Sequence, residues 1–522
     1  MLKCPGIREP DPEKAISVED MRALEINVAL RGLSISILME NAGRSVASAI
    51  ECLKGGVRGA RVDVIAGKGG NAGDGFVAAR YLSLAGARVR VHLAYSPHTI
   101  AHKAAARNYG LLKSMDDVEV IEPHGNGWLE LGDSDIVVDA LLGMGVRGAL
   151  RSPIREAVEA INKSPALKVS IDTPTGLDPD TGEVSGTAVK ADVTVSLHAP
   201  KRGLLSEKSR AHVGRLVVAD IGIPLNALDE AGPGDYVARV PDRPRDAHKG
   251  VGGRVLIVAG SRDYIGAPIL AAAAASVIAD LVYLLSTREA AYAAASRVSS
   301  VIPRVFNDGR FSRRDLATIE ALLDRVHSIV VGPGISRDEE IMEAVAELMD
   351  RVRGKPTVLD ADALSIVAET GGLWEEAVIT PHRGEIRSIG RALGVSAEKP
   401  LESTRLIASR LGCVVALKGP TDFVCDPRGK CRYNRRGAPS MSVGGTGDLL
   451  VGLIASIMAR RAALGLDPDP LNSAAVALYV NGRAGELADR EYGGAVTAYS
   501  ISELLPKAIY EARELSQKIA EG

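Results

Sequence analysis

Residues 440–456 read S-M-S-V-G-G-T-G-D-L-L-V-G-L-I-A-S, so one acid, Asp448, follows a glycine-rich loop and opens an apolar, helix-like run. The free backbone N–H groups of a helix N-terminus bind anions, and glycines leave those groups open to a ligand. Asp448 is therefore better suited to take a proton from an attacking hydroxyl than to bind an anion. The pattern indicates phosphoryl transfer, in which the amides stabilise the phosphate and the acid activates the acceptor.

Asp448 also has a purely structural interpretation, because an acid in the first turn stabilises a helix by about 0.3–1 kcal/mol. The chain has no G-x-x-x-x-G-K-[ST] motif, which excludes a P-loop. The preceding segment V-V-A-L-K-G-P-T-D (414–422) offers Lys418 and a turn suited to a nucleotide. A lysine at a strand end is equally compatible with a solvated surface position.

The first half of the chain carries a second glycine-rich turn, A-G-K-G-G-N-A-G-D-G (66–75). Gly67 to Ala72 fits G-x-G-x-x-A between a predicted strand and a predicted helix, which is the context that binds a pyrophosphate. A nicotinamide dehydrogenase also needs an acid about 20 residues later, at the end of the next strand, to hold the ribose. That strand ends V-H-L-A-Y-S-P-H without one. Hydride transfer is therefore not favoured, and a tight turn that requires glycine is the structural alternative.

Polar residues follow three predicted strands of this half: Asn71 comes after the first, Asp139 ends another, and Asp172 and Thr175 lie in S-I-D-T-P-T-G-L-D. Ligands of open parallel sheets bind beyond the carboxyl ends of the strands, so we expect these side chains to share a crevice. Each of them alone also fits a cap or an Asx-turn. Together they offer oxygen ligands for a cation and a carboxylate for proton transfer.

Short β-branched runs alternate with helix-length segments in both halves, which predicts two α/β domains with parallel strands. Strands are predicted in the first half over residues 61–66, 87–93, 135–140, 168–172, 192–197 and 214–222. Those of the second half are predicted over residues 253–261, 281–286, 328–334, 356–363, 377–381 and 413–419. A capping box at Ser17–Asp20 starts a helix. A linker rich in Pro, Gly and charge is expected around residues 224–250.

Bulk properties narrow the function classes. At 522 residues the chain is long enough for two or three domains, and a formal net charge of −2 favours neither nucleic acid nor an anionic membrane as partner. The apolar stretch 267–285 is rich in alanine and contains Asp280, which predicts a crossover helix rather than a membrane span. Five cysteines without C-x-x-C spacing predict reduced thiols and no zinc site. With no apolar leader at the start, we expect a cytoplasmic protein.

The first half resembles the NAD(P)H-hydrate epimerase family in four ordered segments: M-E-N-A-G (39–43), G-K-G-G-N-A-G-D-G (67–75), D-A-L-L-G-M-G (139–145) and D-T-P-T-G (172–176). The resemblance implies a Rossmann-like, doubly wound domain over residues 1–230 that interconverts the two C6 epimers of hydrated NAD(P)H. It implies a potassium ion held by Asn71, Asp139 and Thr175. Asp172 contacts the substrate and is the candidate acid/base. The other implied substrate contacts are Gly70, Asn71, Ala72, Gly73, Asp74, Gly143, Met144, Gly145, Val146, Arg147, Gly148 and Ala149.

The match to that family is not complete. Gly70 stands where the family usually has Asn, and Ala72 stands where it has Gly. Thr173 and Thr175 replace Ile and Ser, so the hydroxyl ligand is retained at Thr175. Because glycine has no side chain to offer at position 70, substrate binding is expected to be weaker there.

The second half resembles the ADP-dependent NAD(P)H-hydrate dehydratase family at H-K-G-V-G-G-R-V-L-I-V-A-G-S-R-D-Y-I-G-A-P (248–268), V-G-P-G (331–334), L-D-A-D-A-L (359–364) and T-P-H-R-G-E (380–385). The resemblance implies a ribokinase-like α/β domain over residues 236–522 that phosphorylates the C6 hydroxyl of the S epimer with ADP. Magnesium accompanies ADP, and Glu385 is a candidate to organise its hydrate. The implied contacts to the hydrated nucleotide are Ala267, Gly334, His382 and Asp448. The implied contacts to ADP are Lys418, Gly419, Pro420, Thr421, Asp422, Ala438, Pro439, Ser440, Met441, Ser442, Val443, Gly444, Gly445, Thr446 and Gly447.

Together the two resemblances predict a bifunctional repair enzyme that epimerises (R)- and (S)-NAD(P)HX and dehydrates the S form, converting ADP into AMP and phosphate. The expected partners are NAD(P)HX and ADP, and the families imply a homo-oligomer. Lys418-Gly419-Pro420-Thr421 is one residue tighter than the usual K-G-x-x-T, which leaves the ADP contacts at 420–422 open. The enzymatic alternative is a ribokinase-like small-molecule kinase fused to a nucleotide-binding module. The non-enzymatic alternative is a first domain that acts as a nucleotide-binding sensor or as a protein-interaction module.

Overall fold

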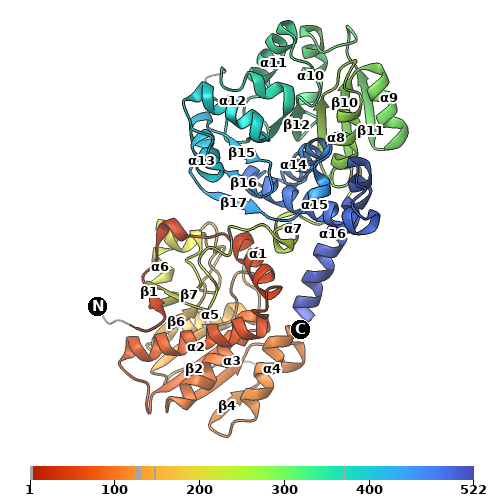
Figure 1. Ribbon diagram of the computed structural model, residues 1–522. Helices are drawn as coiled ribbons and strands as arrows, with labels where there is room; N and C mark the ends of the chain where they lie inside the picture. Colours follow the sequence, from red (N-terminus) through yellow and green to blue (C-terminus); the bar gives the residue numbers. More distant parts are fainter. Residues whose placement is uncertain (1–3, 124–128, 130, 146–147, 370–371, 522) are drawn as a thin grey trace. The chain divides into compact units, whose positions relative to one another are not determined.

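The computed structural model describes residues 4–123, 129, 131–145, 148–369 and 372–521 (Figure 1). The chain forms two compact units. Unit 1 comprises Met1–Ala227 with Ser516–Gly522, and unit 2 comprises Leu228–Leu515. The assignment of one activity to residues 1–230 and another to residues 236–522 stays a prediction.

Unit 1 is an α/β unit, as predicted, and its sheet strands follow the order β1-β8-β7-β6-β5-β2-β3-β4. The described strands are β1 (Ile7–Arg8), β2 (Arg61–Ala66), β3 (Arg88–Leu93), β4 (Val118–Ile121), β5 (Ile136–Ala140), β6 (Leu167–Ile171), β7 (Val193–Leu197) and β8 (Arg215–Ala219). The described α-helices are α1 (Val18–Ala29), α2 (Ile35–Lys54), α3 (Gly70–Leu84), α4 (Lys103–Lys113), α5 (Ile154–Lys163) and α6 (Arg210–Val213). All six predicted strands are confirmed, whereas the short edge strands β1 and β4 were not predicted.

The sheet of unit 1 is doubly wound. Every neighbouring pair is parallel except β1 with β8. The chain runs from β2 outward to β4 and then returns to build β5 to β8 on the other side of β2. Helix α3 packs on the face that carries Val64 and Ala140, and α5 packs on the opposite face with Ile65 and Val137. The topological switch point, where such sheets bind ligands, is therefore the gap between β2 and β5.

Unit 2 is a second α/β unit whose strands follow the order β11-β10-β9-β12-β13-β14-β15-β16-β17. Its described strands are β9 (Arg254–Val258), β10 (Leu281–Ser286), β11 (Val301–Val305), β12 (Ser328–Val331), β13 (Thr357–Leu359), β14 (Ala377–Ile379), β15 (Val414–Leu417), β16 (Asp422–Cys425) and β17 (Cys431–Asn434). The remaining described α-helices are α7 (Pro233–Arg239), α8 (Gly266–Ser276), α9 (Arg288–Arg297), α10 (Leu316–Leu323), α11 (Glu339–Arg351), α12 (Arg383–Leu393), α13 (Pro400–Leu411), α14 (Thr446–Ala463), α15 (Pro470–Tyr492) and α16 (Ala498–Glu521).

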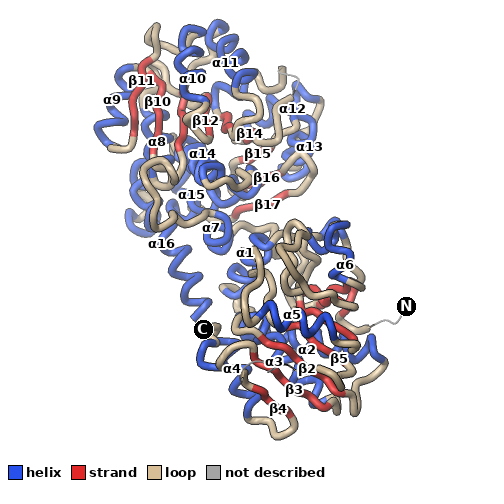
Figure 2. The backbone as a smooth tube through the Cα atoms, turned by 180° about the vertical axis from the view of Figure 1, so that it is seen from behind, coloured by secondary structure: helices blue, strands red, loops and turns tan. Residues whose placement is uncertain are grey.

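The strands of unit 2 are parallel from β11 to β15, and β15, β16 and β17 form an antiparallel edge. Figure 2 shows these strands in red among the helices of the unit in blue. Alternate side chains of β9 serve two cores. Val255 and Ile257 pack with α8, α14 and α15, whereas Leu256 and Val258 pack with α10, α11 and α12. Helices therefore cover both faces, and the carboxyl ends of β12 to β15 meet at one edge where α12 and α14 begin. The six predicted strands are confirmed, and β11, β16 and β17 were not predicted.

The predicted linker around residues 224–250 is wrong in its middle part, because helix α7 forms there. Gly232 occupies the N-cap and Pro233 the first position, so the Gly-Pro pair starts a helix instead of marking a loop. Asp235 is fully buried and accepts from Arg432 at 2.7 Å and from Arg239 Nε at 3.1 Å. A segment with buried, mutually paired charges belongs to the core of unit 2.

The prediction of reduced cysteines is also wrong. Cys4 is bonded to Cys52 and Cys425 to Cys431, and within the described residues Cys413 is free and buried. The first pair is 48 residues apart in sequence, and the second joins directly opposed positions of β16 and β17. Short-range cysteine spacing carries no information on either pair, because both depend on how strands and helices meet.

Alkylation tests these disulfides. The denatured chain should take up one iodoacetamide group without reductant, at Cys413, and five after reduction, as counted by intact mass. The native chain should take up none, because burial raises the pKa of the Cys413 thiol and shields it. Five additions without reductant would contradict both bonds.

Within the described ranges, no helix is long and apolar enough to cross a membrane. The stretch 267–285 forms α8 and most of β10, as predicted. Its alanines allow α14 to approach closely. Gly452 of α14 lies against α8, and a Cβ there would fall 2.2 Å from the Ala271 carbonyl oxygen. The apolar run is therefore a helix-packing surface.

Candidate functional site

The switch point of unit 1 brings two predicted site segments together. A Cβ at Gly67 would lie 2.1 Å from the Leu141 carbonyl oxygen, so only glycine allows the chain after β2 to pass the chain after β5. Helix α3 then begins at Gly70 without a side-chain cap. Gly70–Asp74 therefore forms its first turn, with Asn71 beside Gly143. The glycine-rich turn and the loop after Asp139 share one edge, as predicted.

Asp139 is buried and organises the loop after β6. Its carboxylate accepts hydrogen bonds from the Thr175 hydroxyl at 2.7 Å, the Thr175 amide at 2.9 Å, the Ser170 hydroxyl at 2.9 Å and the Leu141 amide at 3.2 Å. Burial raises the pKa of Asp139, and the hydrogen bonds from Thr175 oppose this. The network fixes Thr175 Oγ next to the Leu142 carbonyl oxygen, 3.1 Å away.

Two of the three predicted potassium ligands, Asp139 and Thr175, offer oxygens of the kind that binds this ion. A carboxylate oxygen of Asp139 and the hydroxyl of Thr175 meet in one network with the carbonyl oxygen of Leu142, which was not predicted, and such oxygens replace the hydration shell of K⁺. In the described part of the chain the buried Asn71 amide nitrogen has no hydrogen-bond partner, so its carboxamide remains available to a ligand. The residues fit a monovalent cation beside a polar ligand.

Asp172 lies at the carboxyl end of β6 in a left-handed backbone conformation, with φ of 62°. It is 5 % exposed, accepts from the Leu197 amide at 3.0 Å and is bonded to the Lys201 ammonium. Lys201 is fully buried and also donates to the Leu197 carbonyl oxygen at 3.0 Å. Strained backbone and a buried ion pair concentrate at functional sites, because the surrounding structure must compensate their cost.

Two further carboxyl groups are electrostatically coupled to this pair. Burial, with the charge of Asp172 adding to it, raises the pKa of Glu25 to about 7. Burial and the charges of Asp172 and Glu25 raise the pKa of Asp74 well above its usual value. The raised pKa favours the protonated form of Asp74, a predicted contact, and this form can donate a hydrogen bond. Carboxyl groups whose pKa is raised beside a buried ion pair are candidates for acid or base roles.

The remaining predicted contacts of unit 1 lie in the loop after β5. Met144 is half-buried, whereas Gly145, Gly148 and Ala149 are exposed. Val146 and Arg147 lie outside the described residues. The role of this loop in substrate binding stays a prediction.

The predicted site of unit 2 is built around Lys418 at the end of β15. Its ammonium donates to Asp360 at 2.9 Å. Burial lowers the pKa of Lys418, but the charges of Asp360, Glu385 and Asp448 more than offset this, so the pKa is raised. A Cβ on Gly447 would fall 3.1 Å from the Lys418 nitrogen, which places the start of α14 against the ion pair. The lysine is therefore a cation of the cleft rather than a solvated strand end.

Asp448 follows directly in the first turn of α14. Gly445 is the N-cap with φ of 98°, and no side chain caps this end of the helix in the described structure. Burial, together with the charge of Asp360, raises the pKa of Asp448 to about 7. The predicted arrangement is thus present: open amides at a helix N-terminus with a carboxyl poised to exchange a proton near neutral pH.

His382 caps helix α12. Its Nδ1 accepts from the Gly384 amide at 2.9 Å and the Glu385 amide at 3.1 Å, while Glu385 accepts from the His382 amide at 2.8 Å. Because Nδ1 accepts these bonds, a neutral ring carries its proton on Nε2, which lies 3.6 Å from Glu385 Oε1. Gly334 lies against Tyr264, where a Cβ would fall 2.5 Å from that of the tyrosine, and Ala267 is in the first turn of α8.

Some predicted ADP contacts have side chains already engaged. Asp422 accepts from the Gly419 amide at 2.9 Å, Ser440 donates to Asp489 at 2.6 Å, and Met441 packs on Gly485. Burial raises the pKa of Asp422 to about 6. At these positions only backbone groups can serve ADP without rearrangement. The exposed members of the predicted set are Gly419, Pro420, Pro439, Ser442, Val443 and Gly444.

Sequence reasoning missed Lys201 and Asp360 as site residues. Lys201 comes four residues after the predicted strand 192–197, in H-A-P-K (198–201), and Asp360 lies within the predicted strand 356–363, in L-D-A-D-A-L (359–364). A buried lysine cannot be distinguished from a solvated one by its position alone. Their partners reveal the roles: Asp172 and Lys201 pair across the ends of the neighbouring strands β6 and β7, and Lys418 and Asp360 pair across the ends of β15 and β13.

Comparison with known proteins covers both units. The family model described as NAD(P)H-hydrate dehydratase matches residues 255–507, and the model of the YjeF-related protein N-terminus matches residues 35–203. The bifunctional NAD(P)H-hydrate repair enzyme Nnr of Hyperthermus butylicus is 41% identical over 517 residues, which are 97% of this chain and 94% of that protein. The chain belongs to the family of bifunctional NAD(P)H-hydrate repair enzymes. Both resemblances stated from the sequence are thereby confirmed.

Solved structures resemble the half of the chain that carries the dehydratase match of this repair-enzyme family. An ADP/ATP-dependent NAD(P)H-hydrate dehydratase from Bacillus subtilis, co-crystallised with ATP and Mg²⁺, is 25% identical and covers 54% of this chain and 97% of its own, with a TM-score of 0.45. A ribokinase-like superfamily protein from Enterococcus faecalis is 22% identical and covers 54% of this chain and 95% of its own, with a TM-score of 0.47.

Proposed function

We propose that this chain repairs hydrated nicotinamide coenzymes with two active sites: an epimerase at the switch point of unit 1 and an ADP-dependent dehydratase in unit 2. Its membership of the bifunctional repair-enzyme family supports both activities. The observation that carries the dehydratase chemistry is Asp448, a carboxyl with a pKa near 7 at an uncapped helix N-terminus beside the Lys418–Asp360 pair.

In the dehydratase, Asp448 takes the proton of the C6 hydroxyl, whose oxygen attacks the terminal phosphorus of ADP. The bond from that phosphorus to the bridging oxygen breaks, and AMP leaves. The open amides of Gly445–Gly447 and the Lys418 ammonium stabilise the negative charge on the phosphoryl group. Loss of phosphate from C6 and of a proton from C5 then restores the double bond of NAD(P)H. Phosphate leaves more readily than hydroxide, which explains why the nucleotide is consumed.

Magnesium is proposed to accompany ADP. The described residues contain no group of three or more His, Cys, Asp or Glu side chains placed to hold a metal directly. Mg²⁺ keeps several waters and is usually held through phosphates and one or two carboxylates, so Asp360, Glu385 and Asp448, whose charges all act on Lys418, suit its hydrate. When bound, the ion neutralises phosphate charge.

In the epimerase, Asp172 is proposed to accept the proton of the C6 hydroxyl, held in place by its hydrogen bond from the Lys201 ammonium. Asp74, whose pKa is raised by burial, supplies a hydrogen bond to the substrate in its protonated form, and Glu25 exchanges a proton near pH 7. Asn71, Asp139 and Thr175 would hold potassium, which would supply positive charge to the site. With Asp172 as proton acceptor and the two acids of raised pKa as donors, the site provides both directions of proton transfer that an epimerisation needs.

The dehydratase should lose activity below neutral pH. Asp448 accepts a proton only when ionised, and its folded-state pKa of about 7 means that the ionised form prevails above pH 7 and falls about tenfold per pH unit below it. The kcat/KM for (S)-NADHX should follow this curve, measured as NADH absorbance at saturating ADP. Asp360→Asn should shift the midpoint to lower pH, because the charge of Asp360 contributes to the raised value. A profile without a transition between pH 6 and 8 would contradict the assignment.

A coupled assay tests the function as a whole. Mixed (R)- and (S)-NADHX is incubated with the chain and with ADP or ATP, and NADH is followed by absorbance. Complete conversion supports both sites. Arrest near half, with the R form remaining, would show an inactive epimerase. No conversion, together with ATP-driven phosphorylation of a small alcohol, would favour the kinase alternative.

We propose a cytoplasmic, homo-oligomeric enzyme that acts on freely diffusing NAD(P)HX and ADP. Light scattering of the purified chain measures its mass in solution against the 54.7 kDa of one copy. A mass equal to one copy would contradict the oligomer.

A further inference from the structure

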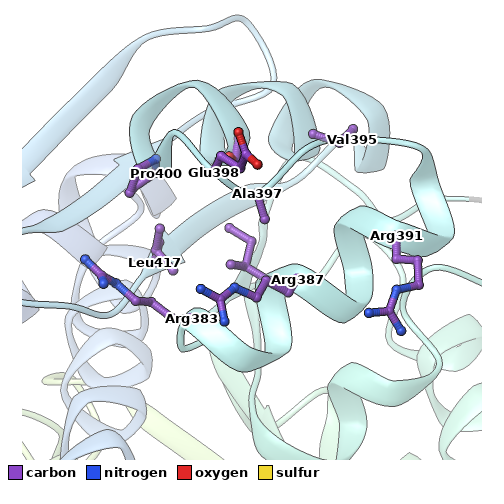
Figure 3. Close-up of a pocket in the computed structure, with 10 residues that line it drawn as sticks. Arg383, Arg387, Arg391, Val395, Ala397, Glu398, Pro400 and Leu417 are labelled. Atoms are coloured by element: carbon purple, nitrogen blue, oxygen red, sulfur yellow. The ribbon is translucent and has the colours of Figure 1, made fainter.

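A cavity of about 440 Å³ lies in unit 2 between helix α12 and the segment that leads into α13 (Figure 3). Arg383, Arg387 and Arg391 project from α12 in a row, and Val395, Ala397, Glu398 and Pro400 lie across from them. The spacing of four residues places successive arginines on one face of the helix, about 6 Å apart along its axis.

These three arginines differ from other exposed arginines of unit 2. On helix α11, Arg351 pairs with Glu347 and Glu320. Arg313, next to that helix, pairs with Glu343 and Glu347. Among the described residues, none of the three cavity arginines forms an ion pair, although each is exposed. Three aligned guanidinium groups without ion-pair partners carry an uncompensated positive charge, which an anionic ligand would neutralise.

The side chains that line the cavity indicate the chemical class of its ligand. Three guanidinium groups and the single carboxylate of Glu398 give a formal charge of 3 − 1 = +2. The hydroxyl of Ser403 already donates to backbone carbonyl oxygens at 2.6 and 2.9 Å, so arginines are the main donors to a ligand. A phosphate monoester carries about −1.5 to −2 charge at pH 7 and matches the planar guanidinium fork.

The cavity adjoins the proposed dehydratase site. Arg383 follows the capping His382, and Leu417 of the cavity wall precedes Lys418. A Cβ on Gly419 would lie 4.0 Å from Arg383 Nε, so the first arginine borders the predicted ADP turn. The row then leads away from the site along α12, over about 12 Å from Arg383 to Arg391.

We propose that this arginine-lined cavity is a binding site for a phosphate monoester group. One source is the 2′-phosphate of NADPHX, whose nicotinamide end would lie near His382. This source rests on the proposed function. The other source is a free phosphate ester that occupies the cavity on its own. Both use the same chemistry, with guanidinium groups donating to phosphate oxygens.

Calorimetry on the full chain tests the site without catalysis. Glycerol 2-phosphate is the probe, titrated into the natural chain and into the Arg387→Ala/Arg391→Ala variant. Arg405→Ala is the matched control, because Arg405 is an exposed arginine of α13 outside the cavity. The double variant should weaken binding about tenfold or more and the control should not. Absence of binding at millimolar concentration, or an equal loss in the control, would overturn the proposal.

Kinetics distinguish the two sources. If the 2′-phosphate is the ligand, the double variant should lower kcat/KM for (S)-NADPHX about tenfold more than for (S)-NADHX. Equal kinetic effects on both, with the calorimetric loss still present, would assign the site to a free ester. A natural chain that dehydrates neither coenzyme hydrate would defeat the proposed function, yet the calorimetric result would stand. Equal melting temperatures of all variants confirm that folding is unchanged.

Discussion

Replacing Asp448 by Asn should lower ADP-dependent dehydration of (S)-NADHX by about 10²–10⁴-fold, the range typical for loss of a general base. The amide keeps the size of the side chain but cannot take the proton of the C6 hydroxyl. Because Asp448 is buried with a pKa of about 7, its removal also relieves a desolvation cost, so the variant should fold. The measurement is initial NADH formation with saturating ADP.

The matched control is Glu402→Gln, which removes an acid from the first turn of another helix, α13. It should leave dehydration unchanged, since it alters only the helix-dipole contribution and a surface ion pair with Lys399. Epimerisation by the Asp448→Asn chain, followed by NMR of the two epimers, should also persist. Dehydration within tenfold of the natural rate would remove Asp448 from the role of base.

Lys201→Met should abolish epimerisation at neutral pH by about 10²-fold or more. The methionine fills the fully buried space but leaves Asp172 without its cation. Removal of one partner of a buried ion pair leaves the other charge uncompensated, so Asp172 should no longer serve as the base. The measurement is the rate at which the two epimers interconvert, followed by NMR.

A cooperative thermal unfolding transition of the variant would show that unit 1 is folded, which separates this loss of activity from misfolding. Dehydration of pure (S)-NADHX by the same chain is an internal control. Lys201→Met combined with Asp172→Asn should cost less than the sum of the two single changes, because the residues act as a pair. Additive losses would show that Lys201 acts independently of Asp172.

The strand ends of both domains could be predicted because the local sequence marks them. Short β-branched runs followed by Asn71, Asp139 or Asp172 define the edge of a parallel sheet, and the glycines before Asp448 define an open helix start. These features depend on neighbours in sequence. The edge strands β4, β11 and β17 escaped prediction because their pairing partners, rather than their own composition, stabilise them.

The parts that escaped prediction are contacts across the chain. Lys201 meets Asp172 and Lys418 meets Asp360 over 29 and 58 residues respectively, and no local pattern specifies either ion pair. The buried ion pair of α7 is another contact between distant parts of the sequence. From the sequence alone Asp235 looks like an acid of a linker, whereas in the structure it pairs with Arg432 of β17. The ion-pair partners could therefore be assigned only from the fold, whereas the candidate base Asp448 could be predicted from the sequence.

The bond between Cys425 and Cys431 has a consequence for heat resistance at the rim of unit 2. β17 is an edge strand of its sheet, and the unpaired backbone groups of an edge strand can pair with another chain. A covalent rung between β16 and β17 keeps the hairpin from sliding or opening. The turn at 418–422 leads directly into β16, so the disulfide that holds β16 to β17 also restrains this turn on warming.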